Sequence, residues 1–216
     1  MITADFIIDK VRLLINETSG EEDLTLLSED TRSIDDTIAG LIADAVLFVQ
    51  QNKSSGSLNP KQYVVGKDAV TENDDGSGAI LLPDDFVSLL SMQMKGWERP
   101  CTQLVAANSP MAVAQSNLLT RGGCSKPVCV EGVSATGAPV LFYYSLPAGA
   151  SAVVEHFIYE AAYNKDAGIN SAPSNPLLTA VAYECAALLY NVFENNAAAN
   201  AFMALALSWC GRTRKE

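Results

Sequence analysis

The sequence predicts an α+β fold in which an α-helical bundle, built from the N- and C-terminal helices, carries a β-rich insertion of sandwich or barrel-like form. Two patterns predict it. At both ends of the chain, apolar residues recur at steps of three and four, as on one face of a helix. Between about residues 53 and 173 they form short alternating runs separated by turn-forming clusters. Aliphatic, aromatic and sulfur-containing residues make up 49% of the 216 residues, which is enough for a substantial core.

Two helices are expected at the N-terminal end. From Thr3 to Glu17 the apolar positions form one stripe, and the Thr3 hydroxyl can accept a hydrogen bond from the first turn. An acidic connector follows. The helical stripe then returns from Ser33 to Gln51, where Ser33 and Asp36 have the spacing of a capping box.

The central part of the chain is expected to form strands. The runs "QYVVGKDAV", "AILL", "VSLLSMQMKGW" and "KPVCVEG" are β-like, and "APVLFYYSLPAGASAVVEHFIYE" is predicted to be two strands around a turn at 147–149. A short helix is expected from Ser109 to Leu119, with Ser109 as its cap and Pro110 in its first turn.

Two further helices are expected at the C-terminal end. Pro176 suits the first turn of one, and a second, from Ala197 to Cys210, is rich in small residues that let helices approach closely. Ala201 and Ala204 are therefore candidates for packing between subunits, and Gly211 is placed to end the helix. The predicted domains are residues 1–52 with 174–216 for the bundle, 53–173 for the insert and 211–216 for an extended tail.

Charge is distributed unevenly along the chain. The net charge is −11, from 25 acidic and 14 basic residues, which argues against a protein that wraps nucleic acid. Residues 1–100 hold 18 acids and 8 bases, whereas residues 101–216 hold 7 and 6. Three of those last six bases are Arg212, Arg214 and Lys215, so the tail is predicted to be a docking segment.

The chain start has no basic segment before an apolar one, so no signal peptide is expected. Its most apolar helix, 197–211, is too short to span a bilayer, so no membrane association is expected. The five cysteines form an odd set, which favours free thiols in a reducing compartment over a disulfide framework.

Residue types that carry chemistry are few. His156 is the one histidine, no Gly-x-Ser-x-Gly segment accompanies it, and a place on a sheet surface is expected. The pair Cys124 and Cys129 lacks further zinc ligands, and "NDDGSG" lacks the acid spacing of a calcium loop, which favours a hairpin turn. No catalytic residue, metal or cofactor is predicted.

The segment "LPDDF" at 82–86 is the remaining candidate. Adjacent aspartates in extended structure point to opposite faces, so Asp84 and Asp85 do not converge as an acid–base pair. Instead, Pro83 and Asp84 are expected to form a turn that directs Phe86 into the core, with Asp85 of little consequence. The prediction is a structural corner between two strands.

These segments carry a resemblance. "LLPDDFVSLLSM", "KGWERP" and "VLFYYSLPAGASAVVEHFIY", placed between helical pairs, resemble the head-to-tail connector proteins of tailed bacteriophages, and in particular the tail adaptors of short-tailed phages. Residues 82–86 match the Leu-Pro-Asp-(Phe/Tyr) corner of that family. Residues 143–149 loosely match its Tyr-x-x-x-Pro-x-Gly hairpin.

The resemblance implies a structural, non-enzymatic virion protein of the neck or tail, assembled in the host cytoplasm. Such proteins form a homo-oligomeric ring of about twelve subunits below the portal protein and contact a tail or second ring protein. DNA passes through the lumen without specific binding. Two alternatives remain open: a binding or adhesion module unrelated to phages, and a carboxylate-dependent hydrolase that uses Asp84 or Asp85.

Overall fold

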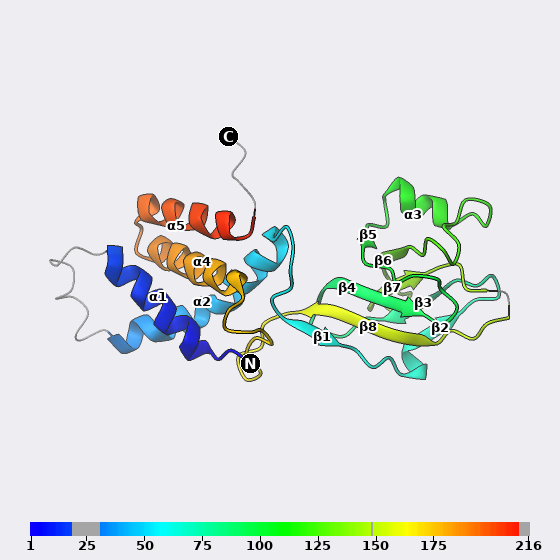
Figure 1. Cartoon of the computed structure of the whole chain (residues 1–216), viewed down its shortest axis with the longest axis horizontal. Helices are drawn as coiled ribbons and strands as arrows, with labels where there is room; N and C mark the ends of the chain where they lie inside the picture. Colours follow the sequence, from blue (N-terminus) through cyan, green and yellow to red (C-terminus); the bar gives the residue numbers. More distant parts are fainter. Residues whose placement is uncertain (19–30, 148, 212–216) are drawn as a thin grey trace. The chain divides into compact units, whose positions relative to one another are not determined.

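The computed structural model describes residues 1–18, 31–147 and 149–211, and it shows the α+β class that the sequence predicts (Figure 1). The chain divides into two compact units. A helical unit comprises Met1–Asn59 with the chain from Ala162 onward, and a β unit comprises Pro60–Ala161. The sequence placed these boundaries after residues 52 and 173. The difference arises because the flanking loops contribute to the helical core, where Leu58 and Ile169 are buried.

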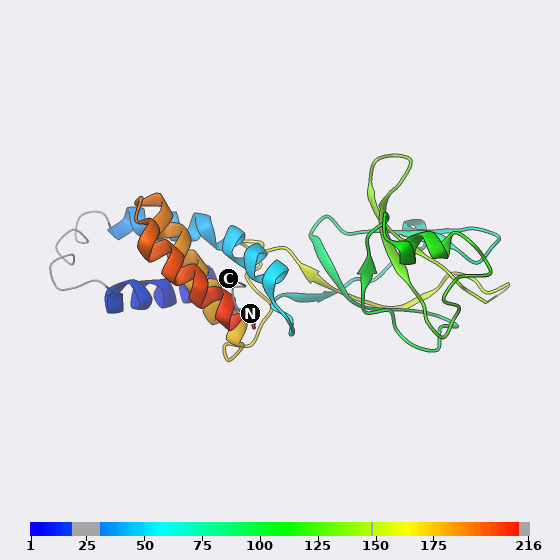
Figure 2. The ribbon, with the colours of Figure 1, turned by 90° about the horizontal axis from the view of Figure 1, so that it is seen from above.

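The described residues of the helical unit form four helices: α1 (Ala4–Thr18), α2 (Thr31–Asn52), α4 (Pro176–Val192) and α5 (Asn196–Trp209). Helix α4 is central, since it packs against α1, α2 and α5 and is buried on most of its surface. Figure 2 shows α5 lying along α4. Between them the Phe202 ring stacks on Tyr190 with centroids 5.4 Å apart.

The ends of these helices follow from local chemistry. The Asn175 side chain accepts a hydrogen bond from the Leu177 amide at 3.0 Å and caps α4, while Asn195 caps α5 through the Ala198 amide. Helix α2 begins at Thr31, so Ser33 lies inside the helix and is not its cap, contrary to the sequence prediction.

The segments that enter and leave the β unit are fixed to the helical unit. Asn59, 1% exposed, donates to the Ala162 carbonyl at 3.1 Å and accepts from the Asn170 amide at 2.9 Å. Ile2 and Ile169 exchange two backbone hydrogen bonds of 2.8 and 2.9 Å. The segment that enters the β unit and the segment that leaves it are therefore hydrogen-bonded to each other within the helical unit.

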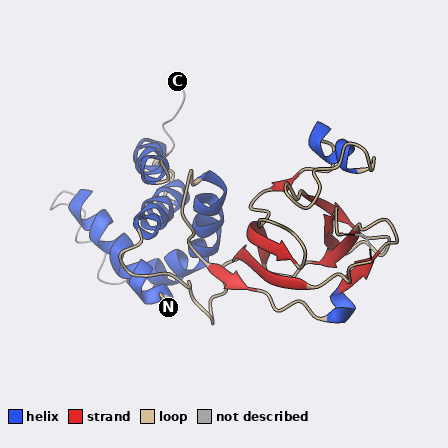
Figure 3. Ribbon diagram, turned by 45° about the vertical axis from the view of Figure 1, so that its right-hand side comes forward, coloured by secondary structure: helices blue, strands red, loops and turns tan. Residues whose placement is uncertain are grey.

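Within the β unit, the described residues form two sheets (Figure 3). The three-stranded sheet has the order β1-β8-β4 and the five-stranded sheet the order β2-β3-β7-β6-β5, antiparallel except for β5 and β6. Side chains from both sheets enter one core, which includes Ile80, Met92, Leu141, Tyr143 and Phe157. The strands are β1 (Pro60–Gln62), β2 (Val70–Glu72), β3 (Gly78–Leu81), β4 (Phe86–Met94), β5 (Leu104–Val105), β6 (Cys129–Val133), β7 (Pro139–Tyr143) and β8 (Val154–Ala161).

The expected pairing of the two strands on either side of residues 147–149 is wrong. Strand β7 pairs with β3 and β6, whereas β8 pairs with β1 and β4 in the other sheet. The connection of residues 144–153 is longer than the two to five residues usual in a hairpin, so it can pass from one sheet to the other. Its first part is held by the Leu146 amide, which donates to the Gly76 carbonyl at 2.9 Å.

A short helix, α3 (Pro110–Gln115), lies between β5 and β6. The predicted start is confirmed: Ser109 accepts a hydrogen bond from the Ala112 amide at 3.2 Å, and Pro110 occupies the first turn. The helix ends at Gln115 and does not continue to Leu119 as predicted.

Candidate functional site

The corner at 82–86 connects the two sheets. The Phe86 amide donates to the Pro83 carbonyl at 3.0 Å and closes a turn between β3 and β4. Phe86 is half-buried, and its ring stacks on Tyr159 with centroids 5.8 Å apart. Pro83 and Phe86 therefore lie in a turn through which the chain leaves one sheet for the other.

The structure reverses the expected roles of the two aspartates. Asp84 is exposed and makes no hydrogen bond within the described part of the chain. Asp85 accepts from Lys61 Nζ at 2.6 Å on one carboxylate oxygen and from Tyr159 Oη at 2.7 Å on the other. The cause is the turn itself, which directs Asp85 toward β1 and β8 and leaves Asp84 at its tip.

These contacts shift the pKa values of Asp85 and Tyr159. Partial burial raises the pKa of Asp85, but the hydrogen bonds from Lys61 and Tyr159 outweigh it, and the pKa lies below its usual value. Burial and the bond to Asp85 raise the pKa of Tyr159. Asp85 is thus an ionised carboxylate with both oxygens engaged, a geometry suited to holding three strands together.

A second turn, at the β2–β3 hairpin, also uses an aspartate. In "NDDGSG" the Asp75 carboxylate accepts from the Ser77 hydroxyl and amide, and from an Arg121 guanidinium nitrogen at 2.6 Å. These bonds lower the pKa of Asp75 to about 2. The Arg121 side chain is 7% exposed, and its guanidinium lies over the Tyr144 ring. The loop is therefore bound to the segment after α3.

The sequence did not predict one hydrogen bond between polar side chains of two strands. Ser91 Oγ on β4 and His156 Nε2 on β8 are 2.9 Å apart and hydrogen-bonded. They are diagonal neighbours on paired strands, a relationship that sequence spacing does not reveal. Among the described residues, no acidic side chain bonds to the other imidazole nitrogen, as the third member of a triad would.

Two cysteines that are distant in the sequence, Cys101 and Cys129, interact in the structure. Cys101 and Cys129 are hydrogen-bonded to each other. The Cys124 thiol donates to the Ser145 carbonyl. The bond between Cys101 and Cys129 lowers the pKa of Cys101 to about 6 and raises that of Cys129. Within the described ranges, all cysteines are free thiols and no group of three or more potential ligand side chains gathers as a metal site would.

Helix α5 presents an uncharged face to solvent. No charged residue lies between Glu194 and Arg212, although the protein carries −11 overall. Ala201 and Ala204, the residues predicted to pack between subunits, are exposed on this face, and Leu205 and Trp209 are 44% and 47% exposed beside them. We call the exposed positions of this helix the α5 face; they are Asn196, Ala197, Asn200, Ala201, Ala204, Leu205, Ser208 and Trp209.

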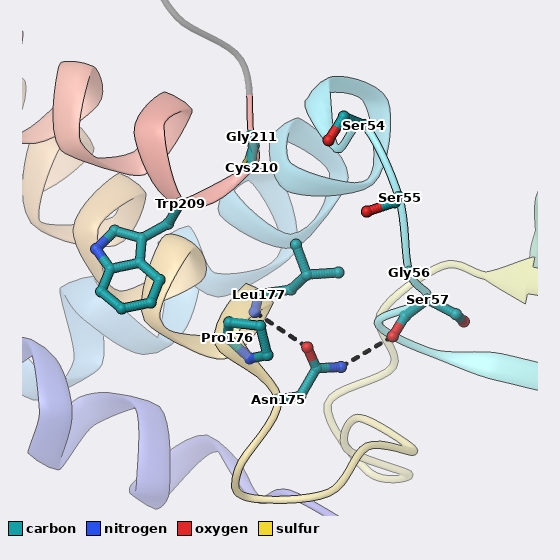
Figure 4. Close-up of a pocket in the computed structure, with 10 residues that line it drawn as sticks. All are labelled: Ser54, Ser55, Gly56, Ser57, Asn175, Pro176, Leu177, Trp209, Cys210 and Gly211. Carbon is teal, nitrogen blue, oxygen red and sulfur yellow. Dashed lines mark hydrogen bonds between the residues drawn. The ribbon is translucent and has the colours of Figure 1, made fainter.

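A pocket of about 270 Å³ opens at the C-terminal end of this face (Figure 4). Trp209 and the segment 54–57 lie on opposite sides of it, with Pro176 and Leu177 between them. The Ser54 amide donates to the Cys210 carbonyl at 2.9 Å, which ties the two sides together. The residues that line this pocket carry no charge.

Gly211 ends the described chain at the edge of the pocket. Its φ of +75° is in the left-handed region, as the sequence predicts for the residue that ends the helix. The candidate docking residues Arg212, Arg214 and Lys215 lie outside the described residues.

The chain matches no model of a known protein family, and no curated protein is significantly similar to it in sequence. Among the described helices, none has the length and apolar character needed to cross a membrane.

Proposed function

We propose that this protein is a head-to-tail connector of a tailed bacteriophage, a structural virion protein that assembles into a ring. The observation that carries the proposal is the uncharged, exposed α5 face on a strongly acidic chain. Copies that each carry −11 repel one another, so close contact is least costly where both surfaces lack charge. The exposed face of a surface helix usually carries charged and polar side chains, whereas the exposed face of α5 carries no charged one.

The composition of the face suits a contact between subunits. Ala201 and Ala204 let a neighbouring helix approach closely, while Trp209 supplies an aromatic anchor of the type that dominates interface energies. A head-to-tail contact of this kind closes into a ring when its rotation permits. We propose about twelve copies per ring.

The connector assignment, beyond self-association, is supported by the resemblance of 82–86 to the corner of that family and by the order of the elements. Residues 143–149 add no support, because β7 and β8 lie in different sheets and do not form that family's hairpin. The ring would sit below the portal protein, contact a tail or second ring protein, and continue the DNA channel from capsid to tail. An acidic protein keeps such a channel from binding DNA. The location is the virion neck, with assembly in the host cytoplasm.

Native mass spectrometry of the purified 216-residue chain tests the ring. The expected result is one dominant species of many copies, near twelve, that persists on dilution to micromolar concentration. A single-chain mass at every concentration would remove the basis of the proposal.

A further inference from the structure

Cys101 and Cys129 come from different parts of the β unit and meet in its core. Cys101 follows β4 and exchanges two backbone hydrogen bonds of 2.8 Å with Met92 of that strand. Cys129 begins β6, in the other sheet, where it pairs with Leu104 and Tyr143. The contact between the two thiols therefore lies between the five-stranded sheet and a segment that is bonded to the three-stranded sheet.

The two side chains are directed toward each other. Their thiols are hydrogen-bonded, and the Cys101 sulfur also accepts from the Cys129 amide. A disulfide forms without backbone movement only where two cysteine side chains face each other at close range, and this pair meets that condition. The other three cysteines lie elsewhere: Cys124 donates to the Ser145 carbonyl, and Cys185 and Cys210 belong to the core of the helical unit.

Cys101 is the nucleophile of the pair. The hydrogen bonds from Cys129 lower the pKa of Cys101 to about 6, so this sulfur is a thiolate near pH 7. Cys101 is 5% exposed and lies between exposed residues at 98–100 and 102–103. An isolated bridge to Met92, rather than a continuous strand, holds it in place. Local opening of such a segment costs little free energy and admits a small oxidant.

We propose that Cys101 and Cys129 form a reversible disulfide when the folded chain meets hydrogen peroxide. The Cys101 thiolate attacks one peroxide oxygen, the O–O bond breaks, and the departing hydroxide takes up the proton that Cys101 had released. The Cys129 sulfur then attacks the sulfur of the resulting sulfenic acid. The S–S bond forms as the S–O bond breaks, and the oxygen leaves with the Cys129 proton as a second water. The two thiols lose two electrons, which the peroxide gains.

The bond links the two sheets and closes residues 102–128, which include β5 and α3, into a covalent loop. A disulfide that fits the folded geometry stabilises a protein by restricting its unfolded chain. Oxidation should therefore raise the melting temperature by at least about 5 °C. The inference does not depend on the proposed ring, because both cysteines belong to one chain.

Counting free thiols tests the proposal. The purified chain is reduced, treated with hydrogen peroxide at pH 7, unfolded and alkylated. The number of alkylated cysteines should fall from five to three because two are linked, and dithiothreitol should restore all five. Tandem mass spectrometry of the linked peptide should place the bond between Cys101 and Cys129. Cys124→Ser, the matched control, should keep both the bond and the rise in melting temperature, whereas Cys101→Ser should lose both.

Three results would overturn the proposal. The first is five alkylated cysteines after a treatment that fully oxidises glutathione, and the second is a bond that includes Cys124. The third is a sulfinic acid at Cys101 beside an alkylated Cys129, which would mean that the two sulfurs do not react with each other. A correct bond with an unchanged or lowered melting temperature would contradict the fit to the folded geometry. Each readout is the same for a monomer and for a ring, so failure of the proposed function leaves this test intact.

Discussion

Tyr159 on β8 donates a 2.7 Å hydrogen bond to one carboxylate oxygen of Asp85, in the turn that leads into β4. The other oxygen accepts from Lys61 on β1. One side chain thus connects all three strands of the smaller sheet at the point where the chain arrives from the larger one. This relationship changes the expected effect of substitutions in "PDDF".

Asp85→Asn should lower the free energy of unfolding by about 1–2 kcal/mol at pH 7, a figure kept small because the ion pair is about one-third exposed. The pKa of Asp85 is lowered by folding, so its contribution is present above the unfolded pKa and is lost as pH falls through the folded value. The parent should therefore lose its advantage over the variant in acid.

Urea unfolding at pH 7 and pH 3 measures this difference. Asp84→Asn is the matched control, and it should be nearly silent because that side chain is exposed. Equal effects of the two substitutions at pH 7 would show that the Asp85 bonds contribute no stability.

Phe86→Ala should cost about 2–3 kcal/mol of unfolding free energy. The value is below the roughly 3–5 kcal/mol expected for a fully buried ring because Phe86 is half-buried, but stacking on Tyr159 and an edge contact with Phe157 are lost. Thermal or urea unfolding checks it. A cost below about 1 kcal/mol would mean that these ring contacts do not hold the corner in place.

Glu184 on α4 predicts a second pH dependence, of opposite sign. The side chain is 5% exposed, one carboxyl oxygen has no hydrogen-bond partner among the described residues, and burial raises the pKa to about 7. Its cost to folding is absent below about pH 4, grows as pH rises toward 7, and is constant above. Glu184→Met should therefore stabilise the protein by about 1–3 kcal/mol more at pH 8 than at pH 4. A stability difference that does not change with pH would contradict the burial of this carboxyl.

Ala204→Trp tests the α5 face. Ala204 is exposed, so the chain should fold as before, but the larger side chain should weaken contact between subunits by about 1–3 kcal/mol through overpacking. Ala39→Trp, at an exposed alanine of α2, is the control. Sedimentation velocity over a concentration series compares them. Assembly of the Ala204 variant at parental concentrations would exclude close packing at this position.

Deletion of residues 212–216 tests the basic tail. The described helical core ends at Cys210, so the melting temperature should not change. Arg212 and Arg214 can bind carboxylates with two hydrogen bonds each, so the truncated chain should bind a portal ring more weakly and with less dependence on salt. Under the connector proposal, co-sedimentation with the matching portal protein across a salt series measures this. Undiminished binding would place the docking surface elsewhere.

The sequence predicted several features that depend on neighbouring residues, although the cap at Ser33 and the end of α3 were predicted wrongly. Three such features follow from local rules, and the structure shows each one. They are the cap at Ser109, Pro176 in the first turn of α4, and the left-handed conformation of Gly211. The strand pairing failed because β7 and β8 are close in sequence but belong to different sheets. Periodicity reports which residues share a face and does not report which strand lies beside another.

At the candidate sites, too, the sequence predicted local features and did not predict contacts between distant residues. Sequence alone identified the corner, yet it could not separate Asp84 from Asp85, because Lys61 and Tyr159 are distant in the chain. The Ser91–His156 and Cys101–Cys129 contacts likewise join remote segments. The α5 face was partly predictable, since an uncharged run of small residues is visible in the sequence, whereas its exposure required the structure.

Electron microscopy of the purified chain, with averaging of single particles, tests the central claim most directly. The ring proposal predicts closed annular particles with an open channel and rotational symmetry near twelve, formed by the parent and by Ala39→Trp. Uniform small particles of one or two chains, at concentrations where the protein is folded and soluble, would contradict it.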